Sequence, residues 1–183
     1  IHTNSNWYEL TKTRYVHQET NHMFFRIDST QKVESADISK IDFDYDAIVI
    51  SDYNKGFLTS EDITYICENH SNVFIDTKKI LGNWISKAKF IKINDIEYKK
   101  SKQFLTPELS EKIIHTMGGL GCEYRGKRYP TKKVEVRDLS GAGDTFMAAF
   151  VVKYLETDDV DQSIKFANQC AAKVVSQKGV NTI

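Results

Sequence analysis

The segment 137–155 constrains the fold more than any other part of the chain. Gly141 and Gly143 flank an alanine, Asp144 follows at once, and the run 146–152 is apolar on nearly every face, as in a buried helix. A loop of small residues that opens a helix points several backbone N–H groups at one spot, with the positive end of the helix dipole behind them. The segment therefore predicts a phosphate site that carries its own carboxylate.

Asp144 gives this site a second possible use. If the bound anion is a phosphoryl group in transit, Asp144 can take the proton from the hydroxyl that attacks it. The loop alone also fits a simpler interpretation, in which Gly-Ala-Gly is a tight turn and an acidic residue is favourable at a helix start. The choice between the two depends on the rest of the chain.

Length and composition limit the class of protein. A chain of 183 residues fits one domain with a substantial core. Its 25 basic and 25 acidic residues balance, so we expect no nucleic-acid partner. Its three cysteines lie outside any Cys-x-x-Cys pattern, which favours a reduced, cytoplasmic protein without structural zinc. No long apolar run is present, so we expect no membrane partner.

Buried strands and helices alternate along the chain. Short apolar strands are predicted at 47–51, 73–76, 90–93, 113–116 and 134–136, and helices at 59–69, 81–86, 144–155 and 160–175. An antiparallel pair is expected within 12–28 and a hairpin within 122–129. This alternation predicts an α/β fold, an open and mostly parallel sheet with helices on both faces.

Polar residues end these predicted strands, and ligands of open α/β sheets bind at the carboxyl ends of strands. The set contains lysines, acids, an amide and glycines: Asp52, Lys55, Asp76, Lys78, Asn94, Glu97, Thr116, Gly118, Gly121 and Asp138. Each is ordinary loop chemistry by itself. Together they supply what nucleotide phosphates and Mg²⁺ require, namely ammonium groups, backbone amides and oxygen ligands. Their order therefore favours a phosphoryl-transfer site over a tight turn.

The chain resembles the carboxyl-terminal part of a PfkB-type, ribokinase-like carbohydrate kinase. Three segments carry the resemblance. Residues 138–146 are similar to the family's second signature, 116–121 to its nucleotide-contacting turn and 94–97 to its Asn-x-x-Glu motif. Within the family, four further segments resemble kinases of D-glycero-D-manno-heptose 7-phosphate: 51–56, 76–78, 12–14 and 26–28. The resemblance covers residues 8–183 and implies the ribokinase-like form of the α/β fold, with 12–28 as a small β lid.

The resemblance implies a role for each matching residue. Asp144 is the expected catalytic base, with an anion hole formed by Gly141, Ala142 and Gly143. ATP is the expected phosphoryl donor, contacted by Lys78, Asn94, Glu97, Thr116, Gly118, Gly121 and Asn168. Mg²⁺ is expected at Asn94 and Glu97, directly or through water, and a monovalent cation such as K⁺ at Asp138.

The sugar side of the site is expected at the lid and the first strand end. Arg14, Asp52 and Lys55 are the implied substrate residues, and the basic lid suggests an acceptor that already carries a phosphate. The implied reaction is transfer of the ATP γ-phosphoryl group to a sugar hydroxyl, the anomeric hydroxyl of the heptose 7-phosphate. Simpler interpretations stay open at this stage, with Glu97 a solvated helix charge, Lys78 a surface lysine and Arg14 an exposed strand residue.

One departure from the family affects function. Its first βαβ units, with a Gly-Gly signature and an aspartate that binds sugar hydroxyls, are expected to precede residue 1, so 1–183 is expected to be one partial domain without its N-terminal strands. Two functions follow: the nucleotide half of a sugar-phosphate kinase, or a non-catalytic nucleotide-binding or partner-binding remnant of a split or decayed kinase. The expected partner chains are a second copy, through the lid, or a complementary N-terminal half.

Overall fold

A six-stranded sheet forms the centre of the molecule in the computed structural model, which describes residues 9–20, 22–30, 33–177 and 179. The strands lie in sequence order: β3 (Ile48–Asp52), β4 (Val73–Thr77), β5 (Phe90–Asn94), β6 (Ile113–Thr116), β7 (Cys122–Tyr124) and β8 (Lys127–Tyr129). Strands β3 to β6 pair in parallel, and β7 and β8 continue the sheet antiparallel. The predicted mostly parallel sheet and the hairpin within 122–129 are confirmed.

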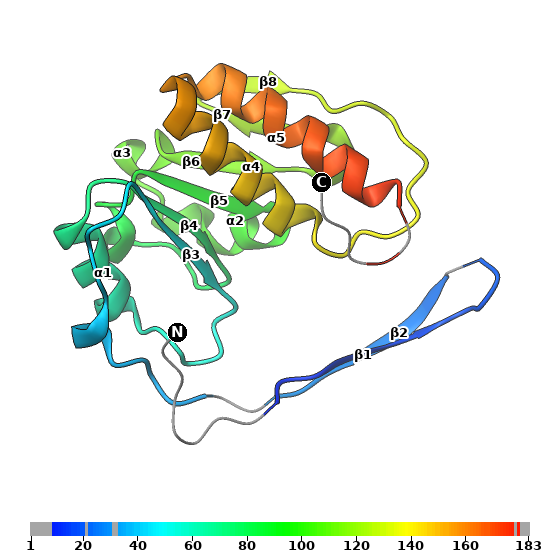
Figure 1. Cartoon of the computed structure of the whole chain (residues 1–183), viewed down its shortest axis with the longest axis horizontal. Helices are drawn as coiled ribbons and strands as arrows, with labels where there is room; N and C mark the ends of the chain where they lie inside the picture. The colour runs from blue at the N-terminus through cyan, green and yellow to red at the C-terminus, as the bar shows by residue number, and fades with distance from the viewer. Residues whose placement is uncertain (1–8, 21, 31–32, 178, 180–183) are drawn as a thin grey trace.

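Helices cover both faces of the sheet (Figure 1). One face packs against α4 (Ala142–Thr157) and α5 (Val160–Val175), and its core contains the aromatic residues Phe74, Phe90, Phe146, Phe150 and Tyr154. The other face packs against α1 (Ser60–Asn69) and carries a core rich in isoleucine, which includes Ile50, Ile63, Ile75, Ile91 and Ile93. Burial on both faces explains why β4 and β5 are apolar without alternation, whereas Val49 of the edge strand β3 is 48% exposed.

The connections follow from local sequence signals. Thr59 caps α1 with a reciprocal bond from Asp62, and Asp159 caps α5. Two short helices join β5 to β6: α2 (Asp95–Ser101) and α3 (Pro107–Ser110), which starts with a proline in its first turn. Within the described residues, no helix is long and apolar enough to cross a bilayer.

Two predictions about local structure were wrong. The segment 134–136 forms no strand, and Val134 and Val136 are exposed. Among the described residues, the edge strand β8 pairs with β7 and not with this segment. The expected helix within 81–86 is a single 3₁₀ turn at Asn83–Ile85. The first difference matters for function, because the irregular segment 130–141 becomes part of the cavity described below.

Strands β1 (Lys12–Val16) and β2 (Met23–Asp28) form a separate antiparallel hairpin, which we call the lid. It extends on the side of the sheet toward which β3 points (Figure 1). Residue 21, in its expected turn, lies outside the described residues. Strand alternation puts Arg14 and Arg26 on one face and the stacked rings of Tyr15 and Phe25 on the other. The second face is exposed and apolar, and self-association through it stays a prediction.

Candidate active site

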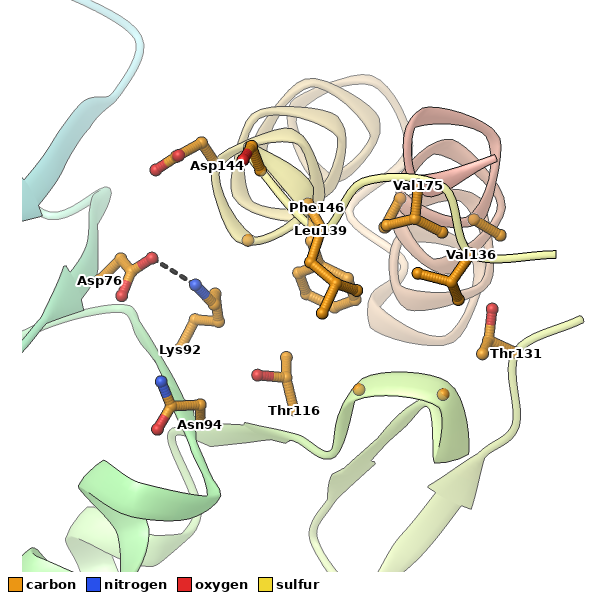
Figure 2. Close-up of a pocket in the computed structure, with 18 of the residues that line it drawn as sticks. Asp76, Lys92, Asn94, Thr116, Thr131, Val136, Leu139, Asp144, Phe146 and Val175 are labelled. Carbon is orange, nitrogen blue, oxygen red and sulfur yellow. Dashed lines mark hydrogen bonds and ion pairs between the residues drawn. The ribbon is translucent and has the colours of Figure 1, made fainter. Parts of the chain in front are cut away.

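A cavity of about 940 Å³ lies at the carboxyl ends of the parallel strands and reaches the lid. One end is polar and contains Asp144, Asp76 and Lys92 (Figure 2). The other end is lined by apolar side chains, among them Val136 and Leu139, which are 56% and 69% exposed. A cavity with a charged end and an apolar end fits a ligand with a phosphate chain and a flat heterocycle.

The central loop has the geometry of an anion site. Gly141 is the N-cap of α4 and has φ 78°, a left-handed conformation that glycine adopts without steric cost. Thr145 N donates to Gly141 O at 2.8 Å, so the helix begins directly after the loop. Asp144 lies in the first turn and lines the polar end of the cavity. Ala142 N donates to Leu139 O at 3.3 Å, outside the helix. The first N–H groups of a helix generally lack an acceptor within the helix, and together with the dipole they favour a bound phosphate.

A buried ion pair lies below this loop. Lys92 on β5 pairs with Asp76 on β4, and burial raises the pKa of Asp76 while Lys92 opposes the rise. A Cβ atom built on Gly143 would lie 2.9 Å from Lys92 Nζ, so the ammonium is packed against the loop. A buried ion pair is weak evidence for stability. Its position places an ammonium where phosphate oxygens would bind.

Asn94 and Glu97 form a capping box at the start of α2. Asn94 Oδ1 accepts from Glu97 N at 3.1 Å, and Glu97 Oε2 accepts from Asn94 N at 2.8 Å. Glu97 Oε1 also accepts from Lys78 Nζ at 2.5 Å. Burial alone would lower the pKa of Lys78, but the hydrogen bond and charge of Glu97 raise it above its usual value. Glu97 is therefore buried and hydrogen-bonded, not the solvated helix charge of the simpler interpretation.

These residues fit Mg²⁺ only in a supporting role. The Glu97 carboxylate already accepts three hydrogen bonds, from Lys78 and from two nitrogens of Asn94. Among the described residues, no cluster of three or more His, Cys, Asp or Glu could hold a metal ion by itself. Mg²⁺ in phosphoryl-transfer sites usually keeps several waters and binds one or two carboxylates plus the substrate phosphates. Asn94 and Glu97 would hold such an ion through water.

The turn that is expected to contact the nucleotide also lines the cavity. Thr116 ends β6, and Gly118 and Gly121 follow in a 3₁₀ turn that is closed by Met117 N donating to Gly121 O at 2.7 Å. Asn168 on α5 also lines the cavity, but its Nδ2 donates to Tyr129 O at 3.0 Å. Asn168 thus fastens α5 to the end of β8, which is a structural task beside any contact with a nucleotide.

The lid contributes positive charge to the cavity through Lys12, Arg14 and Arg26. Arg26 Nε lies 2.6 Å from Asp28 Oδ1, whereas no ion pair or hydrogen bond is found for the Arg14 side chain within the described part of the chain. Asp138 lies nearby in the central loop. Hydrogen bonds from Ser140 lower the pKa of Asp138, and the charge of Arg14 lowers it further.

Two predicted substrate residues lie outside the lining of the cavity. Asp52 is buried, and its carboxylate accepts from Thr77 Oγ1 at 2.7 Å and Lys79 Nζ at 2.8 Å. Lys55 Nζ donates to Ser29 O at 2.7 Å, at the base of the lid. Both residues hold together the segments around the site. A direct contact with substrate stays a prediction for each of them.

Sequence reasoning missed several residues of the cavity. Tyr53 and Lys92 are the most informative, because each contacts the central loop or Asp144. Lys92 carried a signal, since it is a charged residue inside the otherwise apolar strand Phe-Ile-Lys-Ile. Tyr53 carried none beyond its place after Asp52. The segment 131–136 was missed as part of the cavity, and its last three residues were expected to form a strand.

The fold and cavity define a class of protein: an open α/β domain with a glycine-rich helix start beside a cavity, an acid in the first turn of that helix and a lid. The model of the family described as "pfkB family carbohydrate kinase" matches residues 6–183. The chain therefore belongs to the pfkB family of carbohydrate kinases.

Individual relatives agree with this assignment. The bifunctional protein HldE of Nitratiruptor sp. is 28% identical over 190 residues, which are 89% of this chain and 41% of that protein. The chain thus spans about two fifths of the length of this curated relative. The crystal structure of a ribokinase from Thermotoga maritima superposes with a TM-score of 0.67 at 20% identity, over 94% of this chain and 66% of that chain.

A second solved structure is the ribokinase of Arabidopsis thaliana complexed with ribose and ATP. It has a TM-score of 0.57 at 18% identity and covers 72% of this chain and 51% of that chain. Both ribokinases show that the fold is ribokinase-like.

Proposed function

We propose that this chain is the nucleotide-binding part of an ATP-dependent sugar-phosphate kinase, whose acceptor is the anomeric hydroxyl of D-glycero-D-manno-heptose 7-phosphate. The observation that carries the proposal is one cavity that joins Asp144, the phosphate-binding start of α4 and the basic face of the lid. The Arabidopsis ribokinase, with ribose and ATP bound, supports ATP as the donor.

The chemistry follows from the polar end of the cavity. The acceptor oxygen bonds to the γ-phosphorus, the bond from phosphorus to the bridging oxygen of ADP breaks, and the acceptor proton passes to the Asp144 carboxylate. The helix start and Lys92 stabilise the negative charge on the transferred group. Mg²⁺ would neutralise phosphate charge beside Asn94 and Glu97, and K⁺ at Asp138 would add positive charge behind the loop.

Positive charge on the lid supports an acceptor that already carries a phosphate. Arg14 has no ion-pair partner among the described residues, and a phosphate would give its guanidinium a bidentate acceptor. An uncharged sugar would bring no anion to Lys12 and Arg14. The apolar end, near Val136 and Leu139, is far better suited to adenine than to a sugar (Figure 2).

We expect Arg14→Ala in the full-length protein to raise the KM for the sugar phosphate at least about 10-fold, because a hydrogen-bonded charge pair is lost. The KM for ATP should change less than about 2-fold. The measurement is ADP release against a panel of sugars with and without a phosphate. Arg128→Ala is the matched control, since Arg128 lies on β8 outside the cavity lining.

Efficient use of unphosphorylated sugars by the wild type would contradict the heptose-phosphate assignment and leave the wider family. ATP binding without turnover on any sugar or sugar phosphate in the panel would favour the alternative, a non-catalytic nucleotide-binding remnant.

A further inference from the structure

Tyr53 lies between the lid and the proposed base, and the roles assigned so far do not use it. It follows β3 directly and lines the cavity. Its hydroxyl lies 3.4 Å from Asp144 Oδ1 and 3.5 Å from Oδ2. Lys12 Nζ lies 4.1 Å from the centroid of its ring. One side chain therefore contacts both a lid residue and the residue proposed to take the proton.

The backbone that carries Tyr53 is fixed by the sheet. Asp52 Oδ1 accepts from Asn54 N at 2.9 Å, and Asp52 Oδ2 accepts from Thr77 Oγ1 at 2.7 Å. Lys78 N donates to Asp52 O at 3.0 Å, which joins the ends of β3 and β4. These bonds hold the residues on each side of Tyr53. The backbone that carries the phenol is therefore held at the edge of the sheet, where the ring meets Lys12 of the lid.

The charge environment of Lys12 favours its contact with the ring of Tyr53. Burial lowers the pKa of Lys12, Asp28 opposes this effect, and the positive charges of Arg26, Arg14 and Lys78 lower the pKa further. An ammonium is thus held among like charges. The negative face of an aromatic ring attracts a cation, so the ring of Tyr53 offsets part of this cost. The contact holds the first lid strand against the end of β3.

The hydroxyl of Tyr53 can donate to Asp144. Burial raises the pKa of Tyr53, the charges of Asp144 and Asp76 raise it further, and Lys78 opposes them, so the phenol keeps its proton near neutral pH. The oxygen–oxygen distance of 3.4 Å is longer than a usual O–H···O bond. Hydrogen bonds of catalytic groups are often long without substrate and shorten in the reacting complex.

We propose that Tyr53 is a positioning residue that couples the lid to the base. Its hydroxyl orients the Asp144 carboxylate toward the acceptor, and its ring seats Lys12 so that the lid lies over the acceptor when the base is aligned. The proposal rests on the proposed function, because it requires an acceptor held between Asp144 and the lid.

Removing only the hydroxyl of Tyr53 separates its contact with Asp144 from its contact with Lys12. In the full-length protein, Tyr53→Phe should lower kcat about 10-fold while both KM values stay within about 2-fold, since the ring that seats Lys12 remains. Tyr65→Phe is the matched control, because Tyr65 and Tyr53 are both 44% exposed and Tyr65 lies on α1 outside the cavity lining. A wild-type kcat for Tyr53→Phe would overturn the positioning role.

A double-mutant cycle tests the seating of Lys12. Lys12→Met and Tyr53→Leu should each raise the KM for the sugar phosphate. The increase in KM for the double variant should be smaller, by about 2-fold or more, than the product of the two single increases, because both changes remove the same cation–ring contact. Effects that multiply would overturn the coupling of ring and lid.

A titration without substrate keeps this proposal apart from the proposed function. The ultraviolet absorbance of the phenolate, wild type minus Tyr53→Phe, reports the midpoint of Tyr53. Asp144→Asn should move that midpoint to lower pH, because a negative charge beside the phenol is lost while Asp76, Lys78 and Lys12 remain. An unchanged midpoint would overturn the Tyr53–Asp144 contact, whereas absence of turnover in the wild type would overturn the proposed function alone.

Discussion

Asp144→Asn in the full-length protein should lower kcat by about 10²–10⁴-fold while ATP affinity stays close to that of the wild type. Asparagine keeps the shape of the side chain and its hydrogen-bonding capacity, but it cannot take a proton from the acceptor. The backbone N–H groups at the start of α4 are unchanged, so the phosphate site remains. Sugar-dependent ADP release measures the first quantity, and calorimetric titration with Mg·ATP measures the second.

Asp158→Asn is the matched control. Asp158 lies at the opposite end of the same helix, outside the cavity lining, and its left-handed φ of 51° is tolerated by asparagine. It should retain wild-type kcat. A variant Asp144→Asn with nearly full turnover would show that another group accepts the proton, and the assignment of the base would be wrong.

The alternation of elements could be predicted because the inner strands β4 and β5 are continuous apolar runs buried on both faces. Ile113–Thr116 and Val160–Val175 match the predicted bounds, and α1 begins one residue after the predicted start because Thr59 is its N-cap. The strand predicted at 134–136 did not form, although β8 lies at the edge of the sheet with one side unpaired among the described residues. Strand formation depends on packing against neighbours, which the sequence of a short segment does not reveal.

The candidate site could be predicted in outline, because the fold brings the carboxyl ends of parallel strands to one edge. Asp144, Lys78, Asn94 and Thr116 therefore line one cavity, although their roles stay predictions. Side-chain partners were beyond the sequence. Asp52 has the same sequence signal as Asp76, yet it is engaged by Thr77 and Lys79 behind the cavity.

The Asn-x-x-Glu motif shows why a motif does not settle a role. Asn94 and Glu97 form a capping box, which is a sufficient structural reason for their spacing. The additional bond from Lys78 to Glu97 is not needed by a cap, and it brings an ammonium beside the cavity. A helix cap and a ligand site therefore share the same two residues, and only substitution with separate stability and activity measurements can divide the two tasks.

The largest expected effect on stability is at Gly121. Its φ of 87° and ψ of −132° lie outside the regions that other residues adopt, and a Cβ atom there would lie 2.1 Å from Tyr129 O. Both the strain and the clash involve backbone, which no side-chain rotation can relieve. We expect Gly121→Ala to lower the free energy of unfolding by about 3 kcal/mol or more. The variant should also raise the KM for ATP, because the turn at 118–121 lines the cavity where we propose that ATP binds.

Gly126→Ala separates strain from crowding. Gly126 also has a positive φ, 73°, but a Cβ atom there would meet nothing within 4 Å. It should therefore cost only about 1 kcal/mol, the strain alone, and leave the KM for ATP unchanged. Urea unfolding of the two variants gives the comparison. Equal midpoints would mean that Gly121 tolerates a side chain. The close packing of the turn at 118–121 against the end of β8 would then not be needed for this side of the cavity.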